Sequence, residues 1–345
     1  MPFVLVEHDV ADATSLEPGL AREIPDPLRQ LRGVGAGGVV GQGRKGNGHG
    51  GGKYRIAAMT GAPHELEDLR EDDLARWLRP RARDSHKGDH GRVLCIGGDS
   101  GHGGAIMLAA EAALRCGAGL VDVATRALHV PALLARRPEV MAHAVDDGRV
   151  PPALLASADV ILCGPGLGQG DWGAAMLAQV LDDARPGTRL VLDADALNLL
   201  ARRPRPLPAD SILTPHPGEA ARLLGIEASE VQRDRAGALQ GLCARYATVV
   251  VLKGAGTLVG ATGRGARRIS AGNPGMAVGG MGDVLAGTIA GLCAQGLEAA
   301  DAAACGALLH ACAGDAAAGE GGERGLLPAD LMPWLRRLAN PQATA

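Results

Sequence analysis

A glycine-rich segment that ends in an aspartate combines residue types suited to phosphate chemistry. Residues 273–287 read Asn-Pro-Gly-Met-Ala-Val-Gly-Gly-Met-Gly-Asp-Val-Leu-Ala-Gly. The apolar run 284–292 predicts a helix, whose free N–H groups and positive dipole end would face the loop and bind phosphoryl oxygens. We expect Asp283 to stay ionised and to accept a proton from an attacking hydroxyl. Asp283 as a simple helix cap is the alternative, but three glycines among the four preceding residues favour the site.

A lysine at the end of a buried strand is the second candidate for a phosphate contact. The apolar run 249–252 is followed by Lys253 and by the turn Gly-Ala-Gly-Thr at 254–257. The chain has lysines only at 45, 53, 87 and 253 and otherwise uses arginine, which favours a specific role for Lys253. A compact ammonium suits a point contact with phosphate, and Thr257 could add a hydroxyl. The alternative is a solvated lysine at a strand end.

Further polar groups follow two other predicted strands. Asp193 and Asp195 could position the waters of a Mg²⁺ ion or bind substrate hydroxyls, but a helix cap at Asp195 and a turn at Asn198 explain these residues equally well. Because the two interpretations are equally good, we do not assign Asp193, Asp195 or Asn198 to the site. In the segment Thr-Pro-His-Pro-Gly-Glu at 214–219, two prolines restrict the backbone and present His216 at the edge of the sheet. A purely structural histidine is the alternative.

These segments need a parallel sheet to bring them together. From Asp73 onward, short β-branched runs alternate with alanine- and leucine-rich stretches of helical length, a pattern typical of βαβ units. Ligands of such sheets bind at the carboxyl ends of strands, where the glycine loops 97–104, 164–168 and 253–257 are expected. The predicted strands are 92–96, 121–124, 159–163, 189–192, 211–213 and 248–252, and the first long helix is predicted over 105–116.

Composition excludes several classes of protein. The 345 residues are 46% hydrophobic and can bury one large core. A net charge of -3, from 35 basic and 38 acidic side chains, offers no excess for nucleic acid or an anionic membrane. The seven cysteines form no CxxC pair, which indicates buried free thiols in a reducing compartment. No apolar run has membrane-spanning length without charge or repeated glycine, so we predict a cytoplasmic protein.

The N-terminal part differs from the rest of the chain. Residues 33–52 contain eleven glycines in twenty positions, and we predict that 1–72 form a flexible extension, too short for an epimerase domain. A GxGxxG match at 33–38 lacks a preceding strand, and a second at 168–173 lies too far beyond its strand. A dinucleotide-dependent dehydrogenase is therefore only a minor alternative. No Walker A motif is present.

Taken together, the motifs resemble those of the ADP-dependent NAD(P)H-hydrate dehydratases. The resemblance extends over 73–340 in order and spacing, and the Gly-Gly-x-Gly-Asp motif alone would also suit thiazole or hydroxymethylpyrimidine kinases. It implies a ribokinase-like three-layer α/β fold with a central, mostly parallel sheet. The segments that carry the resemblance are 86–91, 164–168, 214–219, 253–257 and 273–287.

The resemblance also implies roles for individual residues. Asp283 corresponds to the catalytic aspartate of the family. For Ala105 and Gly166 the residues alone would indicate only helix packing and a turn. The positions implied to bind ADP are Lys253, Gly254, Ala255, Gly256, Thr257 and Gly282, and those implied to bind the substrate are Ala105, Gly166, His216 and Asp283.

The activity implied by the resemblance is repair of damaged nicotinamide nucleotides. A phosphoryl group from ADP, with Mg²⁺, would activate the ring hydroxyl of the S epimer of NADH hydrate or NADPH hydrate, and elimination of phosphate would restore the dihydronicotinamide. A small-molecule kinase of the same fold is the second hypothesis, and a nucleotide-binding regulatory protein without turnover is the third. The sequence leaves open whether the chain forms homo-oligomers and whether a separate epimerase acts upstream.

Overall fold

A single sheet of ten strands organises the described part of the chain. The computed structural model describes residues 66–208 and 210–340, so the glycine tract and almost all of the predicted extension 1–72 lie outside it. The strands in chain order are β1 Glu67–Leu69, β2 Arg92–Ile96, β3 Leu120–Thr125, β4 Met141–Ala144, β5 Val160–Cys163, β6 Arg189–Leu192, β7 Ile212–Leu213, β8 Val249–Leu252, β9 Thr257–Ala261 and β10 Arg267–Ile269.

Strand pairing makes the sheet almost entirely parallel. The order across the sheet is β1-β10-β9-β8-β7-β6-β5-β2-β3-β4, and among these strands only β9 runs antiparallel to its neighbours. Strands β6, β7 and β8 are adjacent and parallel, so their carboxyl ends emerge side by side. The loops after these three strands therefore meet at one edge of the sheet, the carboxyl edge.

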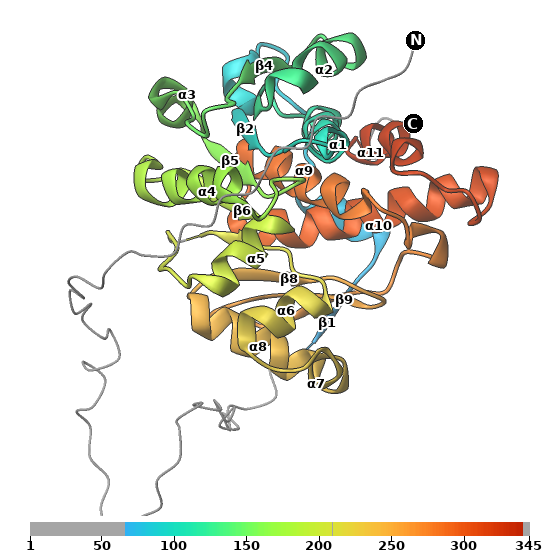
Figure 1. Cartoon of the computed structure of the whole chain (residues 1–345). Helices are drawn as coiled ribbons and strands as arrows, with labels where there is room; N and C mark the ends of the chain where they lie inside the picture. The colour runs from blue at the N-terminus through green and yellow to red at the C-terminus, as the bar shows by residue number, and fades with distance from the viewer. Residues whose placement is uncertain (1–65, 209, 341–345) are drawn as a thin grey trace, which may run out of the picture. The chain divides into compact units, whose positions relative to one another are not determined.

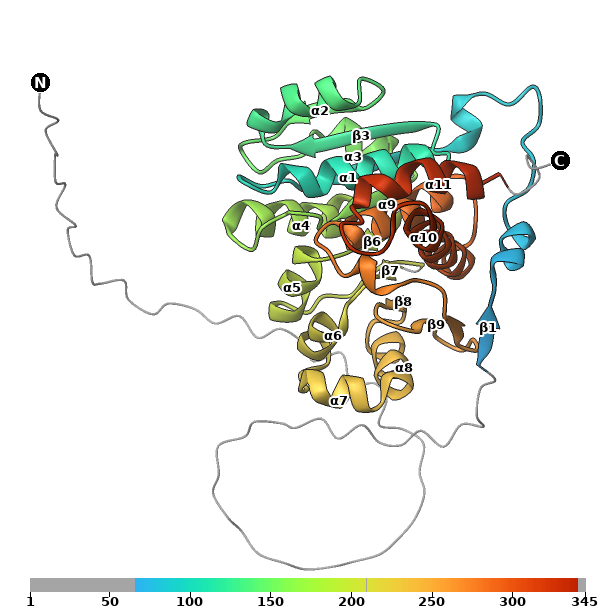
Figure 2. The same cartoon turned by 90° about the vertical axis from the view of Figure 1, so that its right-hand side faces the viewer.

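Helices cover both faces of this sheet. Figure 1 shows α4 to the left of β5 and β6, with α1 and α11 to their right, and the view in Figure 2 shows α1 and α11 next to one another. The helices are α1 Gly103–Arg115, α2 Val130–Arg136, α3 Pro152–Ser157, α4 Asp171–Asp183, α5 Asp195–Arg202, α6 Pro217–Leu224, α7 Ala228–Arg233, α8 Arg235–Tyr246, α9 Met281–Ala294, α10 Ala299–Gly321 and α11 Leu331–Leu338.

Successive side chains along each strand point to opposite faces of the sheet, and this divides the core into two layers. Val249 and Val251 pack with α1, α9, α10 and α11, whereas Val250 and Leu252 pack with α4, α5, α6 and α8. Because both faces are covered, the central strands β5, β7 and β8 are apolar at every position, as expected of a parallel sheet. The predicted three-layer α/β class is confirmed.

Most predicted elements lie where the sequence placed them. The strands predicted at 92–96 and 189–192 match β2 and β6, and the helix predicted at 105–116 corresponds to α1. The unpredicted strands β1, β4, β9 and β10 lie towards the two edges of the sheet, and all but β9 have at most one buried residue, which leaves a weaker apolar pattern. All seven cysteines are buried and unpaired, as predicted. Within the described residues, no helix is both long and apolar enough to span a bilayer.

Strand β1 lies within the stretch that the sequence assigned to the extension. Its residues pair with β10 in parallel register, and the Leu69 side chain is 4% exposed. Asp68 accepts two hydrogen bonds from Arg268, at 2.5 and 2.7 Å. Residues 67–69 thus make contacts that a domain starting at Asp73 would lack.

We predict that a truncated protein beginning at Leu66 is more stable than one beginning at Asp73. Loss of Leu69 burial costs roughly 2 kcal/mol, which corresponds to a fall of about 3–4 °C in Tm for a chain of this size. Thermal unfolding followed by circular dichroism compares the two. Equal Tm values would show that β1 adds nothing to the stability of the domain.

Candidate active site

The glycine loop ends at the beginning of α9, and Asp283 lies inside that helix. The N-cap is Gly280, with φ of 97°, so Asp283 is the third helical residue rather than the cap. In the described structure the N–H groups of Gly282 and Asp283 donate no hydrogen bond. Free N–H groups at the positive end of a 14-residue helix suit an anion.

Lys253 occupies the centre of a buried cluster of charges at the end of β8. Its Nζ lies 2.7 Å from Oδ1 of Asp193 and 3.8 Å from Oε2 of Glu219. Thr214 donates a second hydrogen bond to the same Asp193 oxygen, at 2.7 Å. The Lys253 side chain is 17% exposed and that of Asp193 is 1% exposed. Lys253 is therefore an ion-paired group rather than a solvated strand-end lysine.

Close packing joins the glycine loop to this cluster. A Cβ atom added at Gly282 would lie 3.3 Å from Nζ of Lys253 and 3.8 Å from a carboxylate oxygen of Asp193. A larger residue at position 282 would therefore fill the space between the start of α9 and the lysine. The structure thus brings Lys253, Gly282 and Asp283 together from β8 and α9.

The carboxyl groups in this region have raised pKa values. Burial, followed by repulsion from Asp193, raises the pKa of Asp283 to about 7 against the attraction of Lys253. Burial likewise raises the pKa of Glu219 to about 7. For Lys253, burial favours the neutral amine, but Asp193 and Glu219 outweigh it and raise the pKa, so the ammonium persists. Asp283 is therefore only partly ionised at neutral pH, contrary to the expectation of a permanent carboxylate, because it is more buried than a loop aspartate.

His216 caps α6 next to the same cluster. Its Nδ1 accepts a hydrogen bond from Gly218 N–H at 3.0 Å, and its backbone N–H donates to Glu219 at 2.8 Å. Burial and the nearby Lys253 lower the pKa of the imidazole, which is half exposed and remains neutral. His216 thus faces solvent on one side and fixes the Glu219 carboxylate on the other.

An arginine side chain fixes the turn after β8 by hydrogen bonds to its carbonyl groups. Arg235, the first residue of α8, donates to the carbonyls of Leu252 at 3.1 Å and of Gly256 at 3.4 Å. Thr257 donates its hydroxyl proton to the carbonyl of Gly254 at 2.9 Å. Gly254 has φ of 132° and Gly256 of 67°, which favours glycine at both positions. Ala255, between them, is exposed.

Gly166 and Ala105 form a separate contact at the start of α1. A Cβ at Gly166 would lie 3.2 Å from that of Ala105 and 2.6 Å from the carbonyl oxygen of His102. The loop that carries Gly166 is tied to the end of β6, because Gly168 N–H donates to Asp195 at 2.9 Å. A Cβ at Gly164 would collide with the carbonyl of Asp193. This loop therefore extends the carboxyl edge beyond the lysine cluster.

Asp195 is an acceptor for that loop rather than a helix cap. It begins α5 without capping it, and it also accepts from Gln169 at 2.8 Å. The preceding Ala194 has a positive φ of 48°, a conformation that L side chains rarely adopt. Asp193 and Asp195 consequently serve different neighbours, the lysine and the glycine loop.

Three residues that support the site had no assigned role in the sequence. Glu219 is the last residue of the motif 214–219, and no motif includes Arg235 or Asp315. Asp315, on α10, accepts from Gly272 N–H at 2.8 Å and from the Asn273 amide at 2.9 Å, and so fixes the start of the glycine loop. A sequence signal exists only for Glu219, which follows the His-Pro-Gly turn at capping-box spacing from His216.

Comparison with known proteins identifies the family. A sequence model described as NAD(P)H-hydrate dehydratase matches residues 93–337. The chain belongs to the NAD(P)H-hydrate dehydratase family. It is 41% identical to the ADP-dependent (S)-NAD(P)H-hydrate dehydratase of Streptococcus pneumoniae over 225 residues, which is 64% of this chain and 77% of that protein. The family resemblance seen in the sequence is thereby confirmed.

Longer members of the family match over part of their length. The bifunctional NAD(P)H-hydrate repair enzyme of Coxiella burnetii is 55% identical over 264 residues, which is 76% of this chain and 53% of that enzyme. The chain thus spans about half the length of such relatives.

Solved structures confirm the ribokinase-like fold of this dehydratase family member. A ribokinase-like superfamily protein of Enterococcus faecalis V583 has a TM-score of 0.75 at 32% identity and covers 80% of this chain and 96% of its own. The ADP/ATP-dependent NAD(P)H-hydrate dehydratase of Bacillus subtilis, co-crystallised with ATP and Mg²⁺, has a TM-score of 0.72 at 29% identity, with 81% and 98% covered.

We predict that Asp283→Asn raises the thermal stability at pH 8. Because folding raises the pKa of Asp283 from 3.8 to about 7, the folded protein binds more protons than the unfolded chain between these values and loses stability as pH rises through them. Removing the charge should therefore raise Tm by about 2–4 °C at pH 8, the shift expected of about 1 kcal/mol. The gain should shrink towards pH 5.

The matched control for this prediction is Asp84→Asn, which alters an exposed aspartate outside the site. Its Tm should follow that of the unmodified protein at both pH values. A lower Tm for Asp283→Asn at pH 8 would contradict the raised pKa.

Proposed function

We propose that this chain is a hydro-lyase that dehydrates the S epimers of NADH hydrate and NADPH hydrate in an ADP-dependent reaction. The observation that carries the proposal is the partly ionised Asp283 carboxyl beside Lys253, at the glycine-lined start of α9. A carboxyl with a pKa of about 7 can accept and release a proton at physiological pH. The family to which the chain belongs links this arrangement to hydrate repair.

The residues present fit an adenine nucleotide. The N–H groups at the start of α9 are unpaired, and a side chain at Gly282 would fill the space next to Lys253. We assign the phosphates of ADP to Gly282 and Lys253, and the remainder of the nucleotide to the turn 254–257. This turn includes Gly254, Ala255, Gly256 and Thr257 and extends the chain away from the lysine along β9.

A magnesium ion would be held only in part by the protein. No group of three or more His, Cys, Asp or Glu side chains suited to a metal occurs among the described residues. Mg²⁺ in phosphate-transfer sites is commonly bound by one or two carboxylates together with the phosphates. Asp193 and Glu219 are the carboxylates that would serve, since both lie beside Lys253.

In the proposed reaction the terminal phosphoryl group of ADP would pass to the ring hydroxyl of the hydrate, with AMP as the leaving group. Loss of phosphate together with a ring proton would then restore the dihydronicotinamide. Asp283 accepts the proton that this hydroxyl loses. Lys253 and the N–H groups of Gly282 and Asp283 stabilise negative charge on the phosphoryl oxygens. His216, Gly166 and Ala105 bind the hydrated nicotinamide nucleotide along the carboxyl edge of the sheet.

The same proposal extends to the bounds of the domain, its cellular compartment and a partner activity. We propose that the dehydratase domain occupies residues 73–340, with β1 added at its N-terminal side. Seven buried free thiols suit a reducing compartment, so we propose that the protein acts in the cytoplasm. We also propose that an epimerase acts upstream, on a separate chain or within a longer one; the relative named as a bifunctional repair enzyme, of which the match covers 53%, supports a second activity.

A small-molecule kinase is the competing function on this fold. The hydroxyethylthiazole kinase of Pyrococcus horikoshii has a TM-score of 0.53 at 17% identity and shares the fold alone. Recovery of reduced-nicotinamide absorbance from NADH hydrate and ADP separates the two functions. Phosphorylation of a thiazole alcohol with ATP, without any recovery from the hydrate, would replace the dehydratase proposal.

We predict that Asp283→Asn lowers kcat about 10²- to 10⁴-fold while ADP binding survives, because the amide keeps the size but cannot accept the proton. The absorbance assay gives kcat, and calorimetry gives ADP affinity. Near-normal turnover in a folded variant would remove Asp283 from the mechanism.

We also predict that kcat/KM of the unmodified enzyme rises with pH through about 7. The base must be deprotonated in the free enzyme, and Asp283 has its pKa at about 7. A profile measured from pH 5.5 to 8.5 should therefore show an ascending limb centred near this value. A flat profile over this range would contradict the assignment of Asp283 as the base.

Finally, we predict that Lys253→Met weakens ADP binding about 10-fold or more, because it removes a charged hydrogen-bond donor but keeps the buried volume. Calorimetry measures the change, and Lys87→Met, at an exposed position, is the control. Unchanged ADP affinity in Lys253→Met would limit the lysine to holding its carboxylate neighbours.

A further inference from the structure

A cavity opens at the edge of the sheet opposite to the proposed active site. Its volume is about 540 Å³, within the range of small-molecule sites. Residues at the C-terminal ends of α1, α9 and α11 line it, together with the segment 77–81. The 14 residues of α9 separate it from the glycine loop by about 20 Å along the helix axis.

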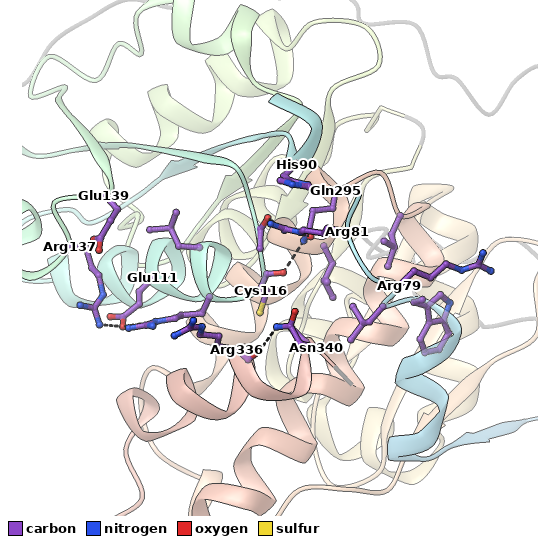
Figure 3. Close-up of a pocket in the computed structure, with 18 residues that line it drawn as sticks. Arg79, Arg81, His90, Glu111, Cys116, Arg137, Glu139, Gln295, Arg336 and Asn340 are labelled. Atoms are coloured by element: carbon purple, nitrogen blue, oxygen red, sulfur yellow. Dashed lines mark hydrogen bonds and ion pairs between the residues drawn. The ribbon is translucent and has the colours of Figure 1, made fainter. Parts of the chain in front are cut away.

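Arginines dominate the polar lining of this cavity. Figure 3 shows Arg79, Arg81, Arg137 and Arg336 arranged around it, with Glu111 beside Arg137. Arg115 also lines the cavity, and Glu139 is the second lining carboxylate. The lining thus contains five guanidinium groups and two carboxylates.

The buried carboxylate is shared among several arginines. Glu111 is 1% exposed and forms an ion pair with Arg137. It also lies 3.1 Å from Arg136 and 3.8 Å from Arg115. Two of these arginines, Arg115 and Arg137, line the cavity together with Glu111, so their positive charges exceed the single negative charge that they share.

The presence of one lining arginine, Arg81, is explained by its interaction with a helix C-terminus, but this does not explain Arg336 or Arg137. Helix C-termini carry negative partial charge, and Arg81 donates to the carbonyl of Gly117 just beyond α1. Gln295 satisfies the neighbouring carbonyls of Cys116 at 2.9 Å and Gly291 at 2.8 Å. Arg336 makes no ion pair within the described residues, and Nε of Arg137 is buried without a hydrogen-bond partner.

Two titratable groups of the lining have lowered pKa values, and burial is the largest cause for both. Burial lowers the pKa of the Arg81 guanidinium, with no compensating acid beside it. Burial, followed by repulsion from Arg81, also lowers the pKa of His90. Both shifts act against further positive charge in the cavity, and a bound anion would relieve them.

Five large apolar side chains also line the cavity. They are Trp77, Leu78, Leu114, Leu292 and Leu297. We propose that this cavity binds a small organic anion, with an apolar body on the leucines and a carboxylate, sulfonate or phosphate on the arginines. The inference does not depend on the proposed dehydratase activity, because no residue of the candidate active site lines the cavity.

The test uses 1-anilinonaphthalene-8-sulfonate as the anionic probe, in the presence of saturating ADP so that the proposed nucleotide site is not available to it. The folded full chain should bind the probe saturably with a rise in fluorescence. The uncharged analogue N-phenyl-1-naphthylamine should bind at least about 10-fold more weakly, the factor set by about 1.4 kcal/mol of charge interaction.

Two variants assign the binding to the cavity. Arg336→Glu reverses an exposed lining charge and should weaken the sulfonate probe at least about 10-fold, whereas Ala339→Trp should exclude both probes by filling the space. Arg203→Glu, at the C-terminal end of α5 and outside the cavity, is the matched control and should leave both affinities unchanged.

The melting temperature of each variant, measured by circular dichroism, shows that it is folded under the conditions of the titration. Equal sulfonate affinity in Arg336→Glu and the unmodified chain would overturn the proposal. So would equal affinity for the charged and uncharged probes.

Discussion

The ion pair between Lys253 and Asp193 is the constraint on which the candidate active site depends. Asp193 and Glu219 keep the buried ammonium charged, and in return it is the only cation recorded in contact with the Asp193 carboxylate among the described residues. Removal of either partner of such a buried pair leaves an uncompensated charge, which is strongly destabilising. The same ammonium opposes the rise in the pKa of Asp283. The Lys253 ammonium therefore both balances the charge of Asp193 and influences the proton affinity of Asp283.

Sheet topology explains why this pair can form. Asp193 follows β6, the His216 turn follows β7 and Lys253 follows β8, and these three strands are adjacent and parallel. Residues separated by 60 positions in the chain thus meet within hydrogen-bonding distance. Glycine allows the remaining approach, since the start of α9 comes so close to the lysine that a Cβ at Gly282 would lie 3.3 Å from it.

The two edges of the sheet have opposite electrostatic characters. At the carboxyl edge, α9 begins and offers unpaired N–H groups beside a cluster of carboxylates and one lysine. At the other edge, α1 and α9 end, and Arg81 and Gln295 satisfy their last carbonyls. Helix dipoles in parallel α/β folds produce this polarity. The arginines at this edge that do not bind helix C-termini make the cavity there a candidate anion site.

The amino-acid sequence by itself determined the fold class, the central strands and the motifs at their ends. Strands buried on both faces must be apolar throughout, and turns with positive φ favour glycine, so both leave strong local patterns in the chain. Short strands such as β4 and β10 escaped prediction because they bury few side chains: β4 has no fully buried residue and β10 has one, Ile269.

Only the tertiary structure decided the partners and protonation of the site residues. The pairing of Lys253 with Asp193, the support of the turn by Arg235 and the pKa of about 7 for Asp283 depend on burial and on distances between segments remote in sequence. The position of Asp283 inside α9 also followed from the helix beginning at Met281, two residues before it. Electrostatic interactions act through space, and a linear pattern of residues does not contain those distances.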